Sequence, residues 1–176
     1  TIGVALGGVA VTALVVDVDV KGTTRAYVGD GATVVASRFD MTADADNDVS
    51  APTTAIGVGL IAGAGILLTA SDTTTVDAYV GPATGNDSST PASVTSTGRI
   101  SIIATIDSEV VAQVLAATLS LTGGAAASVT NTVASPTVRA YLGDDGVLNA
   151  TGNVTILADA VVNAVADGLG LSGSAG

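Results

Sequence analysis

The sequence predicts an all-β chain that folds as a parallel β-helix (a β-solenoid) built from about three degenerate repeats. Three observations predict this class. A block ending in Ala-Tyr-Val/Leu-Gly occurs three times, apolar residues alternate with polar ones at a period of two, and helix-capping and helical charge patterns are missing. In such a fold short strands stack at about 4.8 Å, so that like side chains of successive coils form ladders.

The composition suits thin stacked layers. Hydrophobic residues make up 48% of the 176 residues, but aromatic residues make up only 2%. The apolar residues are therefore mostly Ala, Val, Ile and Leu, which favour strands. The 22 glycines supply the backbone freedom that sharp corners need. Nearly all the acidic residues are Asp, which prefers turns to helix interiors.

Three blocks recur in a fixed order. The tetrapeptide blocks lie at 26–29, 78–81 and 140–143, and contain all three tyrosines. Each follows a stretch rich in Gly, Ala and Val and precedes a strand-like block, at 37–43, 98–104 and 152–158. Arg25 and Arg139 precede the first and third tetrapeptides, which indicates a repeated structural position.

The repeats divide the chain into units of about 55 residues. The units span 1–55, 56–116 and 117–168, and 169–176 opens a fourth. We expect each unit to make two or three coils of about 18–28 residues, and the chain 1–176 to be one solenoid segment of a longer protein. The middle unit is longer because 82–91, rich in Pro, Gly, Asn, Asp and Ser, replaces a short Asp-Gly turn. We expect an exposed loop there, on a face that meets a partner.

Within the units apolar residues alternate with polar ones. The residues Val154, Ile156, Ala158 and Ala160 fall on one side of a predicted strand. The stretches 2–16 and 56–68 are instead apolar on both faces. Either the outer face there is simply rich in Ala and Gly, or it packs against another copy or a capping layer. The second interpretation predicts lateral association.

Charge limits the classes of partner. Five Lys and Arg stand against sixteen Asp and Glu, a net charge of −11 without His. Such a chain repels nucleic-acid phosphates and anionic membranes, whereas calcium is a natural partner for it. The longest apolar run, 2–16, is too short and too alternating for a membrane-spanning helix, so we expect no membrane insertion. The absence of Cys excludes disulfides and thiolate chemistry.

One acidic segment is a candidate cation site. Asp44, Asp46 and Asp48 place carboxylates at alternate positions, as hard cations prefer, and we predict calcium there. The segment lacks the glycine and distal Glu of an EF-hand loop, and the alternative is a solvated acidic turn. The segments 29–31 and 143–146 are expected to be tight turns.

The repeats resemble a known group of proteins. The blocks at 26–34 (AYVGDGATV) and 150–158 (ATGNVTILA) are similar to the β-strand repeats of giant bacterial surface proteins. Those are the filamentous-haemagglutinin-like adhesins and the large autotransporter-type exoproteins. The resemblance covers nearly the whole chain and implies a right-handed parallel β-helix, secretion to the bacterial cell surface, and work in attachment, matrix or biofilm. It brings no catalytic motif.

The sequence therefore favours a structural function. We expect a shaft or filament segment that self-associates laterally or end to end, with a host surface or a polysaccharide as further ligand. The alternative is a carbohydrate- or calcium-binding module that uses the 82–91 loop or the acidic turns. An enzyme ranks last, because paired carboxylates that cleave sugars also need basic and aromatic residues, which are scarce here. No cofactor is indicated beyond calcium.

Overall fold

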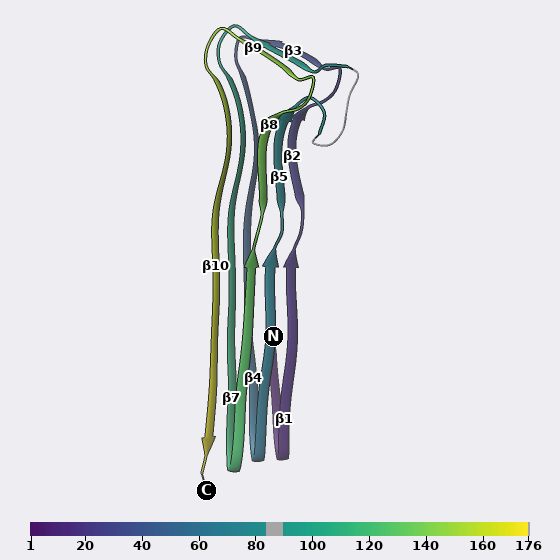
Figure 1. The fold of residues 1–176 in the computed structure, drawn as a ribbon. Helices are drawn as coiled ribbons and strands as arrows, with labels where there is room; N and C mark the ends of the chain where they lie inside the picture. Colours follow the sequence, from purple (N-terminus) through teal and green to yellow (C-terminus); the bar gives the residue numbers. More distant parts are fainter. Residues whose placement is uncertain (84–89, 176) are drawn as a thin grey trace.

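The computed structural model describes residues 1–83 and 90–175, and it confirms the all-β parallel solenoid (Figure 1). The described residues form ten strands, which assemble into three parallel sheets of order β1-β4-β7-β10, β2-β5-β8 and β3-β6-β9. The strands are β1 (Ile2–Val20), β2 (Thr23–Val28), β3 (Thr33–Ala36), β4 (Phe39–Asp72), β5 (Thr75–Val80), β6 (Ser93–Ser96), β7 (Ile100–Ala134), β8 (Thr137–Leu142), β9 (Val147–Ala150) and β10 (Val154–Ser174).

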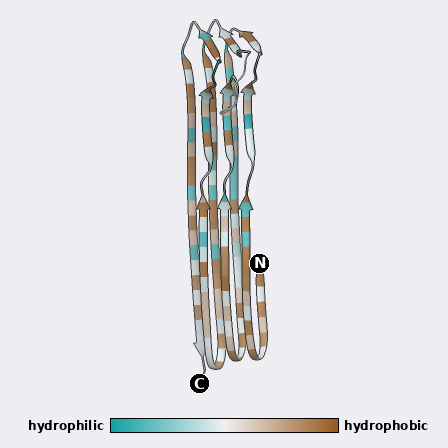
Figure 2. Cartoon of the chain, turned by 45° about the vertical axis from the view of Figure 1, so that its right-hand side comes forward, coloured by the Kyte–Doolittle hydropathy of each residue, from teal (hydrophilic) through white to brown (hydrophobic). Residues whose placement is uncertain are grey.

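Each repeat makes one large coil. Strand pairing joins Phe39 to Ile100 and Ile100 to Val154, which are 61 and 54 residues apart. The expectation of two or three short coils per unit is therefore wrong. The long strands β4 and β7 run down one side of a flat coil, turn back, and rise along the other side (Figure 2). We call these two sides the outgoing limb and the returning limb.

The turn between the limbs falls within a continuous strand assignment. In β4 the pairing register shifts between Gly59 and Ile61. A Cβ on Gly59 would stand only 2.3 Å from the carbonyl oxygen of Gly7, so a side chain has no room there. The chain turns back on glycine and close backbone packing, without the proline and aspartate that mark most turns.

The corners at the opposite end follow the sequence signals. Turns lie at 30–31 and 144–145, which confirms the two predicted tight turns. Gly31 has a φ of 69°, a value that glycine adopts without strain. The amide of Gly146 donates to the carbonyl oxygen of Gly143 at 3.0 Å. These corners lead the chain from β2 to β3 and from β8 to β9.

The core follows the predicted alternation. Ile100 and Ile102 point inward from β7 and are fully buried. Their partners in β10, Val154 and Ile156, occupy the same inward positions but are 47% and 42% exposed, because β10 is an edge strand. The other edge of this sheet is β1.

A buried polar group separates the core into two hydrophobic clusters. At its centre the carboxylate of Asp72 is fully buried and accepts hydrogen bonds from the side chains of Asn47, Thr74 and Ser108. Burial alone would raise the pKa of Asp72, but these hydrogen bonds outweigh it and hold the pKa below its ordinary value. The same position holds Val20 and Ala134 in the adjacent coils.

Candidate ligand-binding face

The candidate site lies on the outer face of the sheet β2-β5-β8. Position by position, the parallel register places Arg25 beside Asp77 and Asp77 beside Arg139. Two residues further along, it aligns the three tyrosines of the repeated tetrapeptide. The inward positions between them, such as Ala78, are buried in the core. The predicted repeated position of Arg25 and Arg139 is confirmed.

The first ladder alternates in charge. Asp77 is 1% exposed and accepts from Arg25 Nε at 3.3 Å and from Arg139 Nε at 2.8 Å. Arg139 Nη2 adds a second contact at 3.0 Å, which makes this pair bidentate. The hydrogen bond to Asp77 raises the pKa of Arg139. Three like charges at the spacing of neighbouring strands would repel one another, and the central aspartate avoids this.

The second ladder is aromatic. The rings of Tyr27 and Tyr79 stack with centroids 5.3 Å apart and planes inclined by 11°. Those of Tyr79 and Tyr141 stack at 5.0 Å and 8°. Tyr79 is therefore covered on both faces, whereas Tyr27 remains 60% exposed. Burial raises the pKa of Tyr79, because a phenolate would lose its hydration there.

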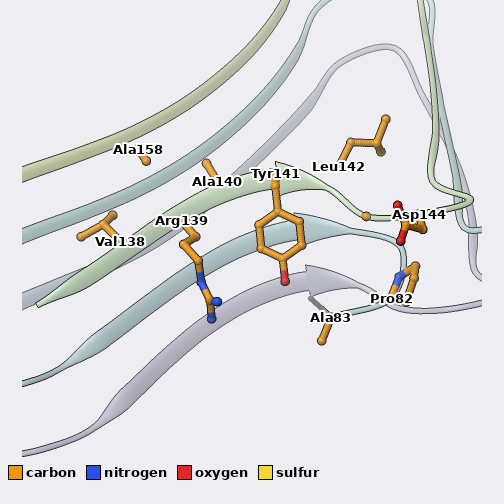
Figure 3. A pocket seen from close by; sticks show the side chains of 10 residues that line it. Pro82, Ala83, Val138, Arg139, Ala140, Tyr141, Leu142, Asp144 and Ala158 are labelled. Atoms are coloured by element: carbon orange, nitrogen blue, oxygen red, sulfur yellow. The ribbon is translucent and has the colours of Figure 1, made fainter. Parts of the chain in front are cut away.

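Two hollows lie beside these ladders, at the base of the predicted 82–91 loop. One, of about 530 Å³, lies along the edge strand β8, and its lining combines Arg139, Tyr141 and Asp144 with core-side residues such as Val138 and, from β10, Ala158 (Figure 3). The second, of about 270 Å³, is lined by residues that include Tyr27, Asp30 and Pro82. Of the loop itself, 84–89 lie outside the described residues, so its predicted exposure stays a prediction.

The first hollow brings together three kinds of polar group that are held by one strand and the turn after it. The guanidinium of Arg139, the phenol of Tyr141 and the carboxylate of Asp144 come from β8 and the turn that follows it (Figure 3). Such donors and acceptors beside an aromatic ring match the hydroxyl and carboxylate groups of a sugar or sugar acid. The three tyrosines, Arg25 and Arg139 were predicted as parts of a repeat, but Asp77 was not, although its offsets of 52 and 62 residues from Arg25 and Arg139 place it at the same position.

The three predicted calcium ligands lie elsewhere, on β4. Asp44, Asp46 and Asp48 are exposed on the outer face of the outgoing limb, so they are solvated as the alternative held, but on a strand and not in a turn. Alternate residues of a strand are about 7 Å apart, too far for three of them to share one ion without help. Across to β7, Asp46 pairs with Asp107 and Asp48 with Glu109. Among the described residues no group of three acidic side chains is gathered closely enough to hold a metal.

Calcium binding at this strand stays a prediction with a direct test. Millimolar calcium should raise the Tm by about 2–5 °C, because an ion bound only by the folded chain stabilises it. The variant Asp44→Asn/Asp46→Asn/Asp48→Asn should lose this shift. Asp144→Asn/Asp145→Asn, which removes two carboxylates from a turn, should keep it. Differential scanning calorimetry with calcium and with a chelator gives the comparison, and equal Tm values for the unsubstituted chain contradict the site.

Comparison with known proteins assigns no role to this face. The chain matches no protein-family model, no curated protein and no solved structure. Within residues 1–83 and 90–175, no helix is long and apolar enough to cross a membrane. The functional proposal therefore rests on the stacking of the coils and on the two side-chain ladders.

Proposed function

We propose that this chain is a structural shaft or filament segment of a secreted bacterial surface adhesin or extracellular fibre, acting in attachment, matrix or biofilm. The observation that carries the proposal is the unbroken coil-to-coil register, in which each sheet stacks like positions of successive repeats. Such a stack is stiff, and its length grows with the number of coils while its cross-section stays constant. Those are the properties that a spacer at a cell surface needs.

The two edges of the large sheet support growth along the axis. β1 and β10 each present a row of backbone groups that a further strand can pair with. On β10 the inward side chains Val154, Ile156 and Val162 are 42–47% exposed, although the partners of the first two, Ile100 and Ile102, are fully buried. A further coil stacked on β10 would bury them, so this edge favours continuation over a free surface.

Electron microscopy of the native material tests the proposal. We expect rods or filaments with a layer spacing of about 4.8 Å along the axis. Filaments assembled from separate copies and rods within one long chain both support a structural shaft, and the mass per length measured by scanning transmission microscopy separates the two. Compact particles without an axial repeat would contradict the proposal.

A second candidate function is polysaccharide binding on the outer face of β2-β5-β8. It is favoured by the hollow in which Arg139, Tyr141 and Asp144 meet beside the base of the 82–91 loop (Figure 3). Deleting residues 84–89 should abolish retention on acidic polysaccharide columns and leave the axial stack intact. The control Thr42→Ala changes an exposed position on the outgoing limb and should leave both unchanged. Unaltered retention after the deletion would exclude this loop as the binding element.

A further inference from the structure

Charge is confined to one end of the coil. All five Lys and Arg and all sixteen Asp and Glu lie within 17–48, 72–109 and 139–167. The segments at the turn between the limbs carry no charged side chain, and we call them the distal lobe: 2–16, 49–71, 110–134 and 168–175. Figure 2 shows these segments together at the end of the coil that bears the turns, where teal is sparse.

From the turn to the row of Val15, Leu67 and Val129, the outer face of the returning limb is apolar. Val15, Leu67 and Val129 form one row across three coils and are 77%, 45% and 57% exposed. The row nearest to the turn contains Val9 and Ile61, which are also exposed. Between these rows the outward positions are Gly or Ala, except for the exposed Val11, so the face has little relief.

Close to the turn, the outgoing limb is apolar on its outer face as well. Leu6 and Leu119 lie at equivalent positions near the turn, and both are more than half exposed. Together with Val58, Leu60 and Leu121 they line a hollow of about 530 Å³ whose walls are almost entirely apolar. The distal lobe therefore exposes hydrophobic side chains on both sides as well as at its tip.

We propose that the distal lobe packs against the distal lobes of further copies of this chain, with neighbouring copies pointing in opposite directions. This deepens the proposed function by naming the lateral contact of the fibre, and it rests on that function. Opposite directions let uncharged lobes overlap while the charged ends, which carry the net −11, project away from one another. Copies that pointed the same way would bring their acidic strands side by side.

The area agrees with contact on both faces. The returning limb offers about 30 Å by 14 Å in projection, on the order of 400 Å², and the outgoing limb offers about the same. Each face alone is about half of the roughly 800 Å² that each partner contributes to a standard interface, and its area grows with every further coil in the stack. With both faces in use, each lobe packs between two others. A lipid bilayer fits less well, because a chain with a net charge of −11 is repelled by anionic membranes.

Two substitutions on the returning limb test the contact. Val15→Glu and Gly65→Asp both place a carboxylate on the outer face, and a Cβ at Gly65 meets no atom within 4 Å, so both variants should fold. We expect each to weaken association roughly a hundredfold or more, since the new charge would be buried without a partner. Thr42→Glu adds the same charge to an exposed position outside the lobe and should leave association unchanged. Sedimentation equilibrium gives the association constants of the variants, and circular dichroism shows whether each variant is folded.

The direction of the copies is tested separately. The chain has no Cys, so a single Val35→Cys substitution at the charged end accepts one spin label. Opposite directions place two such labels well over 60 Å apart, because about 27 residues of strand separate Val35 from the turn. A label at Ala127→Cys, within the lobe, should lie within about 30 Å of another. Short distances between labels at position 35 that disappear when Val15→Glu is added come from lateral contact and not from axial stacking, and they would overturn the arrangement.

The outcomes separate this inference from the proposed function. Rods that keep their axial repeat but lose lateral association in both lobe variants support both proposals. Lateral association that persists in both variants, or a chain that stays monomeric, overturns the lobe contact and leaves the axial shaft standing. Flotation with neutral phosphatidylcholine vesicles, without self-association, would show that the lobe binds lipid and would also overturn the contact. Lateral pairs without an axial repeat would instead contradict the shaft.

Discussion

Replacing Asp72 by alanine should lower the free energy of unfolding by about 3 kcal/mol, because it leaves several buried donors without an acceptor. The donors are the side chains of Asn47, Thr74 and Ser108 and the amide of Thr74. Urea unfolding followed by circular dichroism measures the loss. Asp159→Ala removes an exposed carboxylate from β10 and should change stability by less than about 0.5 kcal/mol.

A combined variant separates the polar group from its surroundings. Adding Asn47→Val and Ser108→Val to Asp72→Ala removes two of the stranded donors, and Val162 already occupies the position equivalent to Ser108 in the next coil. The triple variant should therefore be more stable than Asp72→Ala alone, since an apolar replacement of a whole buried polar group costs little. A triple variant that is less stable than the single one would contradict this account of Asp72.

The stabilisation by Asp72 should depend on pH in a defined direction. The hydrogen bonds lower its pKa in the folded chain below the ordinary value of 3.8, so the unfolded chain binds a proton more readily. The stabilisation is complete above pH 4 and is lost as the pH falls through the folded pKa. The difference in unfolding free energy between the unsubstituted chain and Asp72→Ala should therefore shrink in acid. A difference that grows below pH 4 would reverse the sign of the shift.

Tyr79→Ala should cost about 3 to 5 kcal/mol, because the ring is 6% exposed and packed on both faces. Tyr27→Ala is the matched control at the equivalent position one coil earlier. Its ring is 60% exposed and stacks on Tyr79, and we expect a loss of about 1 kcal/mol. Thermal unfolding of both variants under the same conditions gives the two losses of unfolding free energy and their ratio. Equal losses would show that stacking on the second face contributes nothing.

The parts of the fold that repeat were predictable from sequence. The recurring tetrapeptide placed the three tyrosines at one position, and the structure stacks their rings. The matching blocks around Phe39, Ile100 and Val154 gave the coil-to-coil register directly. Repeated residues must occupy repeated environments in a stack, so self-similarity carries three-dimensional information that a single strand pattern lacks.

The turn between the limbs and the buried Asp72 were not predictable. The turn between the limbs was missed because it falls at Gly59 and Leu60, where the sequence has neither proline nor aspartate. A glycine within an apolar run resembles any other small residue. As a result, two or three short coils per repeat were predicted in place of one long coil. Asp72 was missed because an aspartate is usually exposed, and its equivalents Val20 and Ala134 are apolar. Two of its three side-chain partners, Asn47 and Ser108, are distant in sequence.

Long coils also determine how such a stack would respond to tension. Backbone hydrogen bonds between coils run along the stacking axis. A force along this axis therefore acts first on the hydrogen bonds of the terminal coil, and the coils detach one after another. Paired positions are 52 to 62 residues apart, and each detached coil would release roughly 190 Å of extended chain. The stack shortens by only about 4.8 Å in exchange. Under flow or surface drag, the segment would therefore lengthen in large, discrete steps as successive coils detach. This lengthening would come before the force on its attachment point rises.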